Sequence, residues 1–385
     1  MQKKYKVILG ILALVIVGAG AWFFFGKTEK RGQIAIDNSK LPVQTGPVNE
    51  GPVSPISGIA CDNWNRRPLA VMQPGDVTAR PAAGFSQADM VIEMPVITAS
   101  VTRLMALYVC NTPPEVGSMR SARHDFIQLA KGLDAIFVSW GRSESHSESD
   151  PVGLAKGILD RGEIENINCN GDAGKSANAC TVNPCFRKDG IARGVDSGYA
   201  RPADLLTCAQ NDFQYRMENK FVGYKHAPEA ALDQRPAGGR LRVAYAGPFA
   251  AEYDYNREKN SYDRIWGGVA DTDRNTQERV SPKNIVVMMA QSEQIEGQYN
   301  NVQLGDPWYD HSDSGDTYYY MNGKETRGTW KKDKGDIASK LFFFDESGNE
   351  VNFVPGQIWV EVLEPGQGLR WTEQAMGTQP APIAQ

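Results

Sequence analysis

Two arginines three residues apart are the feature of this chain whose spacing most clearly suggests chemistry. Arg120 and Arg123 lie in the run Gly117-Ser-Met-Arg-Ser-Ala-Arg123, at the start of a helix expected over 118–132. Residues three apart share one face of a helix, and the free backbone N–H groups of its first turn add positive potential there. The spacing therefore predicts a place where an anion such as a phosphate group would be stabilised.

Three further charged residues are expected to join this anion site. Arg80 lies in an Ala-Arg-Pro run and Arg103 lies at the start of an expected strand. Glu93 offers a carboxylate that could orient a ligand or transfer a proton. The predicted anion set therefore contains Arg80, Glu93, Arg103, Arg120 and Arg123.

The same arginines also have a structural interpretation. Arg120 and Arg123 could form internal ion pairs with Asp134, Glu93 or Asp89. Buried arginines of this kind serve the fold and bind no ligand. Both interpretations are open from the sequence, and no residue is assigned a catalytic role.

Metal and cofactor chemistry have weaker signals. Asp271 and Asp273 could bind a hard cation, but their run lacks the spacing and the glycine of an EF-hand loop, so a solvated turn is expected. The cysteines include no Cys-x-x-Cys pair, and few histidines lie near them. No metal site and no cofactor are therefore predicted.

The cysteines indicate an oxidising compartment. The chain has 6 cysteines, an even number, and all follow the apolar N-terminal segment. Three of them fall in a Gly- and Asn-rich segment over 169–185 that has almost no apolar residues to bury, so the segment needs covalent links. Disulfides are predicted to use Cys61, Cys110, Cys169, Cys180, Cys185 and Cys208, without a choice of pairing.

The N-terminus predicts a membrane anchor. Residues 7–25 form an uncharged run of about 19 residues, which as a helix is roughly as long as a bilayer core is thick. Lys3, Lys4 and Lys6 precede the run and favour a cytoplasmic N-terminus. We expect a single-pass protein of the cell membrane with an extracytoplasmic body. The alternative is a cleaved signal peptide, for which Ala19-Gly-Ala21 supplies small residues.

Composition and charge bound what the body can be. The chain has 385 residues, of which 41% are hydrophobic and 23% charged, and a net charge of −5. These values are typical of ordinary globular domains. The charge is not basic enough to follow a nucleic-acid backbone, so no nucleic-acid partner is expected.

The pattern along the chain predicts an α+β protein with two domains. After the anchor (1–25), a Pro- and Gly-rich spacer is expected over 26–59. Short apolar runs alternate with helical patterns over 60–232, which indicates an α/β layered domain. Strand patterns recur without helices over 240–372, and the Asn322-Gly323 and Glu346-Ser-Gly-Asn349 runs are hairpin turns, so this domain is mostly antiparallel β. Residues 373–385 are expected to be a disordered tail.

Several motifs together carry a family resemblance. The chain contains Arg67-Pro-Leu-Ala-Val-Met72, Gly117-Ser-Met-Arg-Ser-Ala-Arg123, Gly328-Thr-Trp-Lys331 and Pro355-Gly-Gln-Ile-Trp359. In these runs it resembles the YerB-like family, bacterial envelope proteins of unassigned biochemical role, over most of 60–365. Members of that family are typically lipoproteins, whereas this chain has no cysteine before Cys61 and a plain apolar anchor instead.

The resemblance implies a binding or scaffolding role in the cell envelope. Its partners would be the membrane, reached through the N-terminal helix, and an anionic envelope polymer or an envelope protein. The alternative is an enzyme acting on phosphate-bearing envelope polymers. In that case the arginines would hold phosphate and Glu93 or Asp134 would handle protons.

Overall fold

The computed structural model describes residues 51–97, 100–143, 154–190, 194–296, 299–302, 304–305 and 312–374. The expected anchor at 1–25 lies outside these ranges, as do the spacer up to residue 50 and the tail from residue 375. Residues 51–59, also expected in the spacer, instead join the body, where Ile56 is fully buried in a core cluster. Glu373 and Gln374, which were assigned to the tail, instead end a strand. Within the described ranges, no helix has both the length and the apolar character that a membrane span requires.

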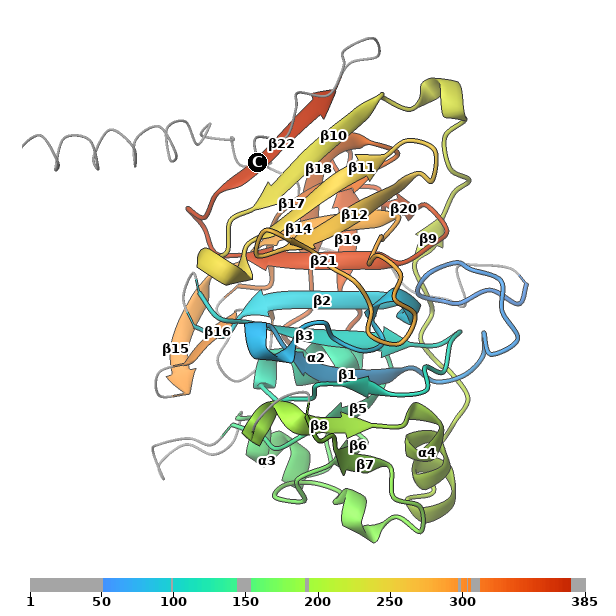
Figure 1. Cartoon of the computed structure of the whole chain (residues 1–385), viewed down its shortest axis with the longest axis vertical. Coiled ribbons are helices and arrows are strands. Elements are labelled where there is room, and N and C mark those ends of the chain that lie inside the picture. Colours follow the sequence, from blue (N-terminus) through green and yellow to red (C-terminus); the bar gives the residue numbers. More distant parts are fainter. Residues whose placement is uncertain are drawn as a thin grey trace, which may run out of the picture. The chain divides into compact units, whose positions relative to one another are not determined.

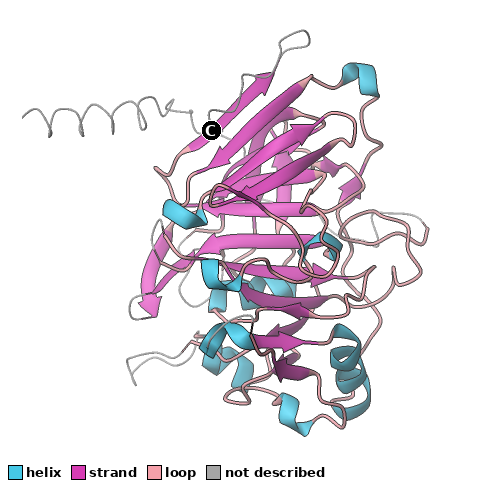
Figure 2. Cartoon of the chain, in the orientation of Figure 1, coloured by secondary structure: helices cyan, strands magenta, loops and turns pink. Residues whose placement is uncertain are grey.

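The described residues form a mixed α/β fold dominated by strands (Figure 2). Its centre is a large sheet of ten described strands in the order β19-β18-β17-β14-β21-β2-β3-β1-β5-β6 (Figure 1). The strands are β1 (Leu69–Pro74), β2 (Met90–Pro95), β3 (Thr102–Tyr108), β5 (Ile136–Ser139), β6 (Asn166–Asn168), β14 (Asn284–Met289), β17 (Ser314–Met321), β18 (Lys324–Lys331), β19 (Phe342–Asp345) and β21 (Ile358–Leu363).

The two ranges expected as separate domains contribute strands to this one sheet. Strand β21, from the second range, pairs in parallel with β2, from the first, and also in parallel with β14. Figure 1 shows β21 lying between β14 and β2. The second range is expected to be mostly antiparallel, but its strands β14 and β21 pair in parallel. Parallel neighbours need a crossover connection between them.

A second sheet packs on one face of the large sheet. It contains five described strands in the order β13-β12-β11-β10-β22, all antiparallel. They are β10 (Gly238–Val243), β11 (Ala251–Asn256), β12 (Ser261–Trp266), β13 (Val269–Ala270) and β22 (Leu369–Gln374). Apolar residues of both sheets share one core cluster, which includes Val91, Trp359, Leu241, Tyr253 and Trp266.

Helices α2 (His124–Gly132) and α3 (Ala155–Asp160) cover the opposite face of the large sheet. Helix α4 (Pro202–Thr207) instead joins the first core cluster through Leu205. Phe126 of α2 and Ile158 of α3 join the other core cluster, together with Met90 and Ile92 of β2. Because side chains alternate along a strand, β2 sends Met90, Ile92 and Met94 to the helices and Val91 to the second sheet. Glu93 follows the same alternation and faces the second sheet.

Smaller sheets complete the described fold. They pair β4 (Val116–Gly117), β8 (Gly198–Ala200) and β7 (Cys185–Arg187), then β9 (Lys225–His226) with β20 (Asn352–Phe353), and β15 (Ser292–Glu296) with β16 (Tyr299–Val302). The predicted Asn322-Gly323 turn joins β17 to β18, with both residues at positive φ (53° and 73°). This left-handed pair is what a tight hairpin requires.

The helix expected over 118–132 begins later than predicted. Helix α2 starts at His124, and Arg123 is its N-cap with an extended backbone. The preceding residues are not helical, because their N–H groups bond to strands: Met119 N–H donates to Gly198 O of β8 (2.8 Å) and Arg120 N–H to Met72 O of β1 (2.9 Å). Arg120 therefore lies outside the helix, and the shared helix face predicted for Arg120 and Arg123 does not exist. The predicted stop at Gly132 is confirmed.

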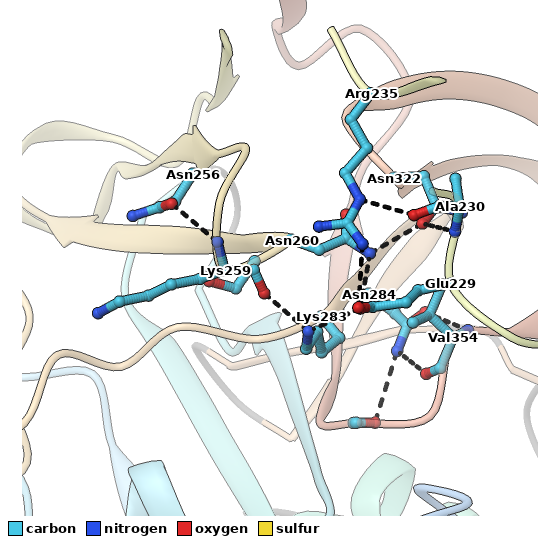
Figure 3. A network of polar contacts seen from close by, with 12 residues as sticks. Glu229, Ala230, Arg235, Asn256, Lys259, Asn260, Lys283, Asn284, Asn322 and Val354 are labelled. Atoms are coloured by element: carbon cyan, nitrogen blue, oxygen red, sulfur yellow. Dashed lines mark hydrogen bonds and ion pairs between the residues drawn. The ribbon is translucent and has the colours of Figure 1, made fainter. Parts of the chain in front are cut away.

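A polar network fixes the linker between the two sequence halves (Figure 3). Glu229 accepts from Lys283 Nζ (2.9 Å), Arg235 Nη2 (3.0 Å) and Asn260 Nδ2 (3.1 Å). Asn260 also donates to Asn322 Oδ1 (2.8 Å), which in turn accepts from the N–H of residue 230. The linker is thus held against two hairpins of the C-terminal half.

Candidate functional site

Two glutamates occupy equivalent positions on the neighbouring strands at the centre of the large sheet. Glu93 of β2 and Glu361 of β21 are direct partners in the parallel register. Both side chains are fully buried (0% exposed) beneath the second sheet. Charged groups are rarely buried without partners, so the residues that face this pair define the candidate site.

Arg264 of β12 supplies the positive charge at this interface. It is fully buried, donates to the Glu93 carboxylate, and donates through Nη1 to Asp271 Oδ2 (2.6 Å). Its guanidinium carbon lies 4.5 Å from the ring centroids of both Trp266 and Trp359. Burial alone would lower the pKa of Arg264, but the surrounding carboxylates outweigh it and hold that pKa well above its usual value.

Two tyrosines of the second sheet bind the other glutamate. Tyr253 of β11 donates to Glu361 and accepts from Arg264 Nε (3.1 Å). Tyr245, just after β10, has its hydroxyl 2.9 Å from Glu361 Oε2. Burial, with the negative charge of Glu93 beside it, raises the pKa of Glu361 to about 8. We call Glu93, Glu361, Arg264, Asp271, Tyr245 and Tyr253 the buried acid network.

The prediction that Asp271 and Asp273 lie in a solvated turn was wrong. Asp271 is 5% exposed and pairs with Arg264, and burial raises its pKa. Asp273 is 1% exposed, and its Oδ2 accepts from the N–H of Gly84 (3.0 Å) and of Ser86 (2.8 Å). The two aspartates therefore bind protein groups on opposite sides of a turn that is packed against the body.

Arg80 borders the buried acid network. Its Nη2 donates to Gly75 O (2.7 Å) and its Nη1 to Trp266 O (3.3 Å), and its guanidinium carbon lies 3.7 Å from the Trp266 ring centroid. Burial lowers its pKa to about 10, against the attraction of Glu93. Among the described residues no carboxylate comes within ion-pair distance of Arg80. The structure therefore brings two members of the predicted anion set, Arg80 and Glu93, into one neighbourhood.

Arg120 pairs with two aspartates near the surface. Its Nη2 lies 2.8 Å from Asp76 Oδ2 and 2.9 Å from Asp196 Oδ1. Asp196 also accepts from Thr78 Oγ1 (2.6 Å). The partners are not the aspartates named from the sequence, but the arrangement is the internal ion pair of the structural interpretation.

Arg103 and Arg123 lie on the other side of the large sheet. In the β2–β3 register Arg103 is opposite Met94, which faces the helices, whereas Glu93 is opposite Leu104, which faces the second sheet. Arg103 Nη1 donates to Ser121 O (2.9 Å) and Arg123 Nη1 to Ala122 O (3.0 Å), and both arginines are buried. The sheet therefore separates Arg103 and Arg123 from Glu93, and the predicted set does not converge on one point.

Sequence reasoning missed Arg264, Glu361 and the two tyrosines. A signal was present, because Glu93 and Glu361 are each a single acid inside an otherwise apolar strand, Met90-Val-Ile-Glu-Met94 and Ile358-Trp-Val-Glu-Val362. An acid at such a position must be buried with a partner. The partner of Glu93, Arg264, comes from a strand 171 residues further along the chain, and the spacing gave no indication of it.

The prediction of disulfides is confirmed. The pairs are Cys61–Cys110, Cys169–Cys185 and Cys180–Cys208. Two of them link the Gly- and Asn-rich segment, as its composition requires. Within the described part of the chain, Cys180, Cys208 and Asp212 come close enough together for a metal ion, but the two sulfurs are bonded to each other and offer no thiolate.

The fold and the site define a strand-rich body with a charged cluster buried between its two main sheets. Residues 56–153 match the family model described as "Protein of unknown function (DUF3048) N-terminal domain", and residues 241–360 match the corresponding C-terminal domain. The chain belongs to this family.

Two comparisons with Bacillus subtilis agree with that assignment. The chain is 26% identical over 318 residues to the protein of strain 168 described as "Putative lipoprotein YerB", covering 80% of this chain and 86% of that protein. The crystal structure of the YerB protein from Bacillus subtilis superposes with a TM-score of 0.67 at 24% identity, covering 83% of this chain and 99% of that chain. The second comparison shows a shared fold.

Proposed function

We propose that this protein is a membrane-anchored, extracytoplasmic binding or scaffolding component of the bacterial cell envelope. One observation carries the proposal: the charged groups best suited to chemistry are satisfied by the protein itself. Glu93 binds Arg264 in the interior, and Arg120 binds Asp76 and Asp196. Groups committed in this way serve the fold and are not free to act on a substrate.

An enzyme acting on phosphate-bearing polymers has less support. Such an enzyme needs cations and a proton-transfer group that converge on one reacting atom. The large sheet lies between Glu93 and the pair Arg103 and Arg123, and Glu93 is fully buried beneath a second sheet. A buried carboxylate in an ion pair cannot reach an external polymer in this arrangement.

The proposed location rests on the cysteines and on the N-terminus. Three disulfides are typical of proteins that fold outside the cytoplasm. The apolar run at 7–25 behind three lysines has the length and charge of an anchor with a cytoplasmic N-terminus. The Bacillus subtilis relative is described as a lipoprotein, which fits a membrane-attached location by a different anchor.

A direct comparison of binding and turnover tests the proposed role. The purified body is incubated with a soluble polyol phosphate polymer, and the release of phosphate and of short fragments is followed over time. In parallel, cells carrying the full chain are crosslinked and its adducts purified under denaturing conditions. We expect reproducible adducts with an envelope component and no turnover. The proposal would be contradicted if wild type degraded the polymer and a folded Glu93→Gln variant did not.

Protease accessibility tests the proposed topology. Protease added outside intact spheroplasts should degrade the body and leave a small N-terminal fragment protected. A cytoplasmic protein serves as the control for spheroplast integrity. Protection of the whole chain would show that the body is not extracytoplasmic.

A further inference from the structure

The hydrogen-bond geometry at Glu361 favours a protonated carboxyl group over a carboxylate. The Tyr245 hydroxyl oxygen lies 2.9 Å from Glu361 Oε2, 3.0 Å from Val362 O and 3.3 Å from Glu93 O. A tyrosine hydroxyl has one proton to donate. If Glu361 were ionised, all three neighbours would be acceptors competing for that proton, in a site with 0% exposure at Glu361.

A protonated Glu361 resolves this competition. Its carboxyl O–H would donate to the Tyr245 hydroxyl, which would then donate to Val362 O. Its other oxygen, Oε1, accepts from Tyr253, whose oxygen accepts from Arg264 Nε. Each donor in this series of hydrogen bonds, from Arg264 to Val362, then faces an acceptor. Buried polar groups need this arrangement.

The distribution of charge selects Glu361 over its neighbour. Arg264 donates directly to Glu93 and to Asp271, whereas the side-chain contacts of Glu361 are with the neutral hydroxyls of Tyr245 and Tyr253. Arg80 lies at the edge of the same group. Three carboxyl groups thus face two guanidinium groups, and one proton on Glu361 makes the buried group neutral overall.

We propose that Glu361 is a proton-binding site, protonated in the folded protein at neutral pH, and that it couples the packing of the two sheets to pH. The groups that face it are Glu93 on β2, Arg264 on β12, Tyr253 on β11, and Tyr245, Asp271 and Arg80 in the adjoining segments. Loss of the proton places two like charges side by side on β2 and β21, beneath the second sheet.

The direction of the pH effect follows from the two protonation states. Burial raises the pKa of Glu361 in the folded protein to about 8, against 4.5 for an ordinary glutamate. The folded state therefore holds a proton that the unfolded state releases. The contribution to stability is fully present below pH 4.5, declines as the pH rises, and is lost above about pH 8.

Glu361→Gln is the informative variant, because the amide has the shape of the protonated acid. Its N–H group can donate to Tyr245 and its carbonyl can accept from Tyr253. Melting temperatures of wild type and variant are measured from pH 5 to pH 9. Wild type should lose roughly 5 °C more than the variant between pH 6 and pH 9.

Asp89→Asn is the matched control. Asp89 is also buried, and it accepts from Ser57 Oγ (2.6 Å) and from the N–H of Val109 (2.7 Å). Both groups donate to the Asp89 carboxylate, so the control variant should melt lower than wild type by a similar amount at every pH tested. Parallel wild-type and Glu361→Gln profiles, or a Glu361→Gln protein that is less stable throughout, would overturn the proposal.

Infrared spectroscopy of wild type tests the proton directly and does not depend on how a variant folds. A buried carboxylic acid gives a carbonyl stretching band that is distinct from the carboxylate bands. We expect this band at pH 6 and its disappearance by pH 9, and we expect it to be absent from Glu361→Gln at both values. A wild-type protein without the band at pH 6 would rule out the protonated glutamate. This result would leave the proposed envelope role untouched.

Discussion

Glu93 and Glu361 lie directly opposite each other on parallel strands, yet of these two glutamates it is Glu93 that accepts from Arg264 of the second sheet. The pair marks the place where strands from the two halves of the sequence meet. Arg264 crosses from the second sheet to reach it, with Trp266 and Trp359 packed against its guanidinium. Arg264 is thus a buried cation that links the two sheets.

Removal of Arg264 should therefore be severely destabilising. Arg264→Ala leaves Glu93 and Asp271 buried without their cation, which costs roughly 3 to 5 kcal/mol of the free energy of unfolding. Arg242→Ala is the control, because Arg242 lies on the outward face of the same sheet with its side chain 52% exposed, and its loss should cost about 0.5 kcal/mol or less. Chemical denaturation of both variants measures the difference. Equal losses would show that the buried network does not hold the sheets together.

The disulfides should be present in protein taken from its native membrane. Intact mass before and after reduction, followed by alkylation, should account for three bridges with the pairings Cys61–Cys110, Cys169–Cys185 and Cys180–Cys208. The double variant Cys180→Ser with Cys208→Ser should lose about 2 to 4 kcal/mol of stability. Six free thiols in the native preparation would contradict the extracytoplasmic location.

The polar network around Glu229 should stabilise the protein less as the pH falls, whereas the contribution of Glu361 to stability declines as the pH rises. Hydrogen bonds from Lys283 and Asn260 lower the pKa of Glu229 to about 2, so its contribution is present above pH 4.5 and lost as the pH falls to about 2. The Glu229 side chain is 43% exposed, so solvent screening limits Glu229→Gln to about 1 kcal/mol or less. Glu258→Gln, at a 73% exposed side chain, is the control and should have no measurable effect. A Glu229→Gln protein whose stability between pH 2 and pH 5 matches wild type would show that the network is incidental.

The local elements were largely predictable from the sequence. Apolar runs such as Met90–Pro95 and Ile358–Leu363 are strands, Gly132 ends its helix, and Asn322-Gly323 forms its hairpin. These features depend on neighbouring residues alone, through side-chain alternation and turn geometry.

The site was harder to predict, because it depends on contacts between distant segments. The period of a helix placed Arg120 beside Arg123, but long-range bonds from the Met119 and Arg120 N–H groups to other strands keep that segment out of the helix. The pairing of β2 with β21 joins residues more than two hundred positions apart and places Glu93 beside Glu361. No local pattern contains that information.

The interpretation of the arginines is the central claim, and thermal melts with added anions test it most directly. Wild type, Arg120→Ala and Arg123→Ala are melted with and without phosphate and pyrophosphate. If the arginines serve the fold, wild type is indifferent to both anions and each variant already melts lower without them, because Arg120→Ala leaves Asp76 and Asp196 without their cation. The opposite result would be that the anions raise the melting temperature of wild type, that neither variant shows this rise, and that both variants melt like wild type without anion. That result would contradict the account and establish the anion site.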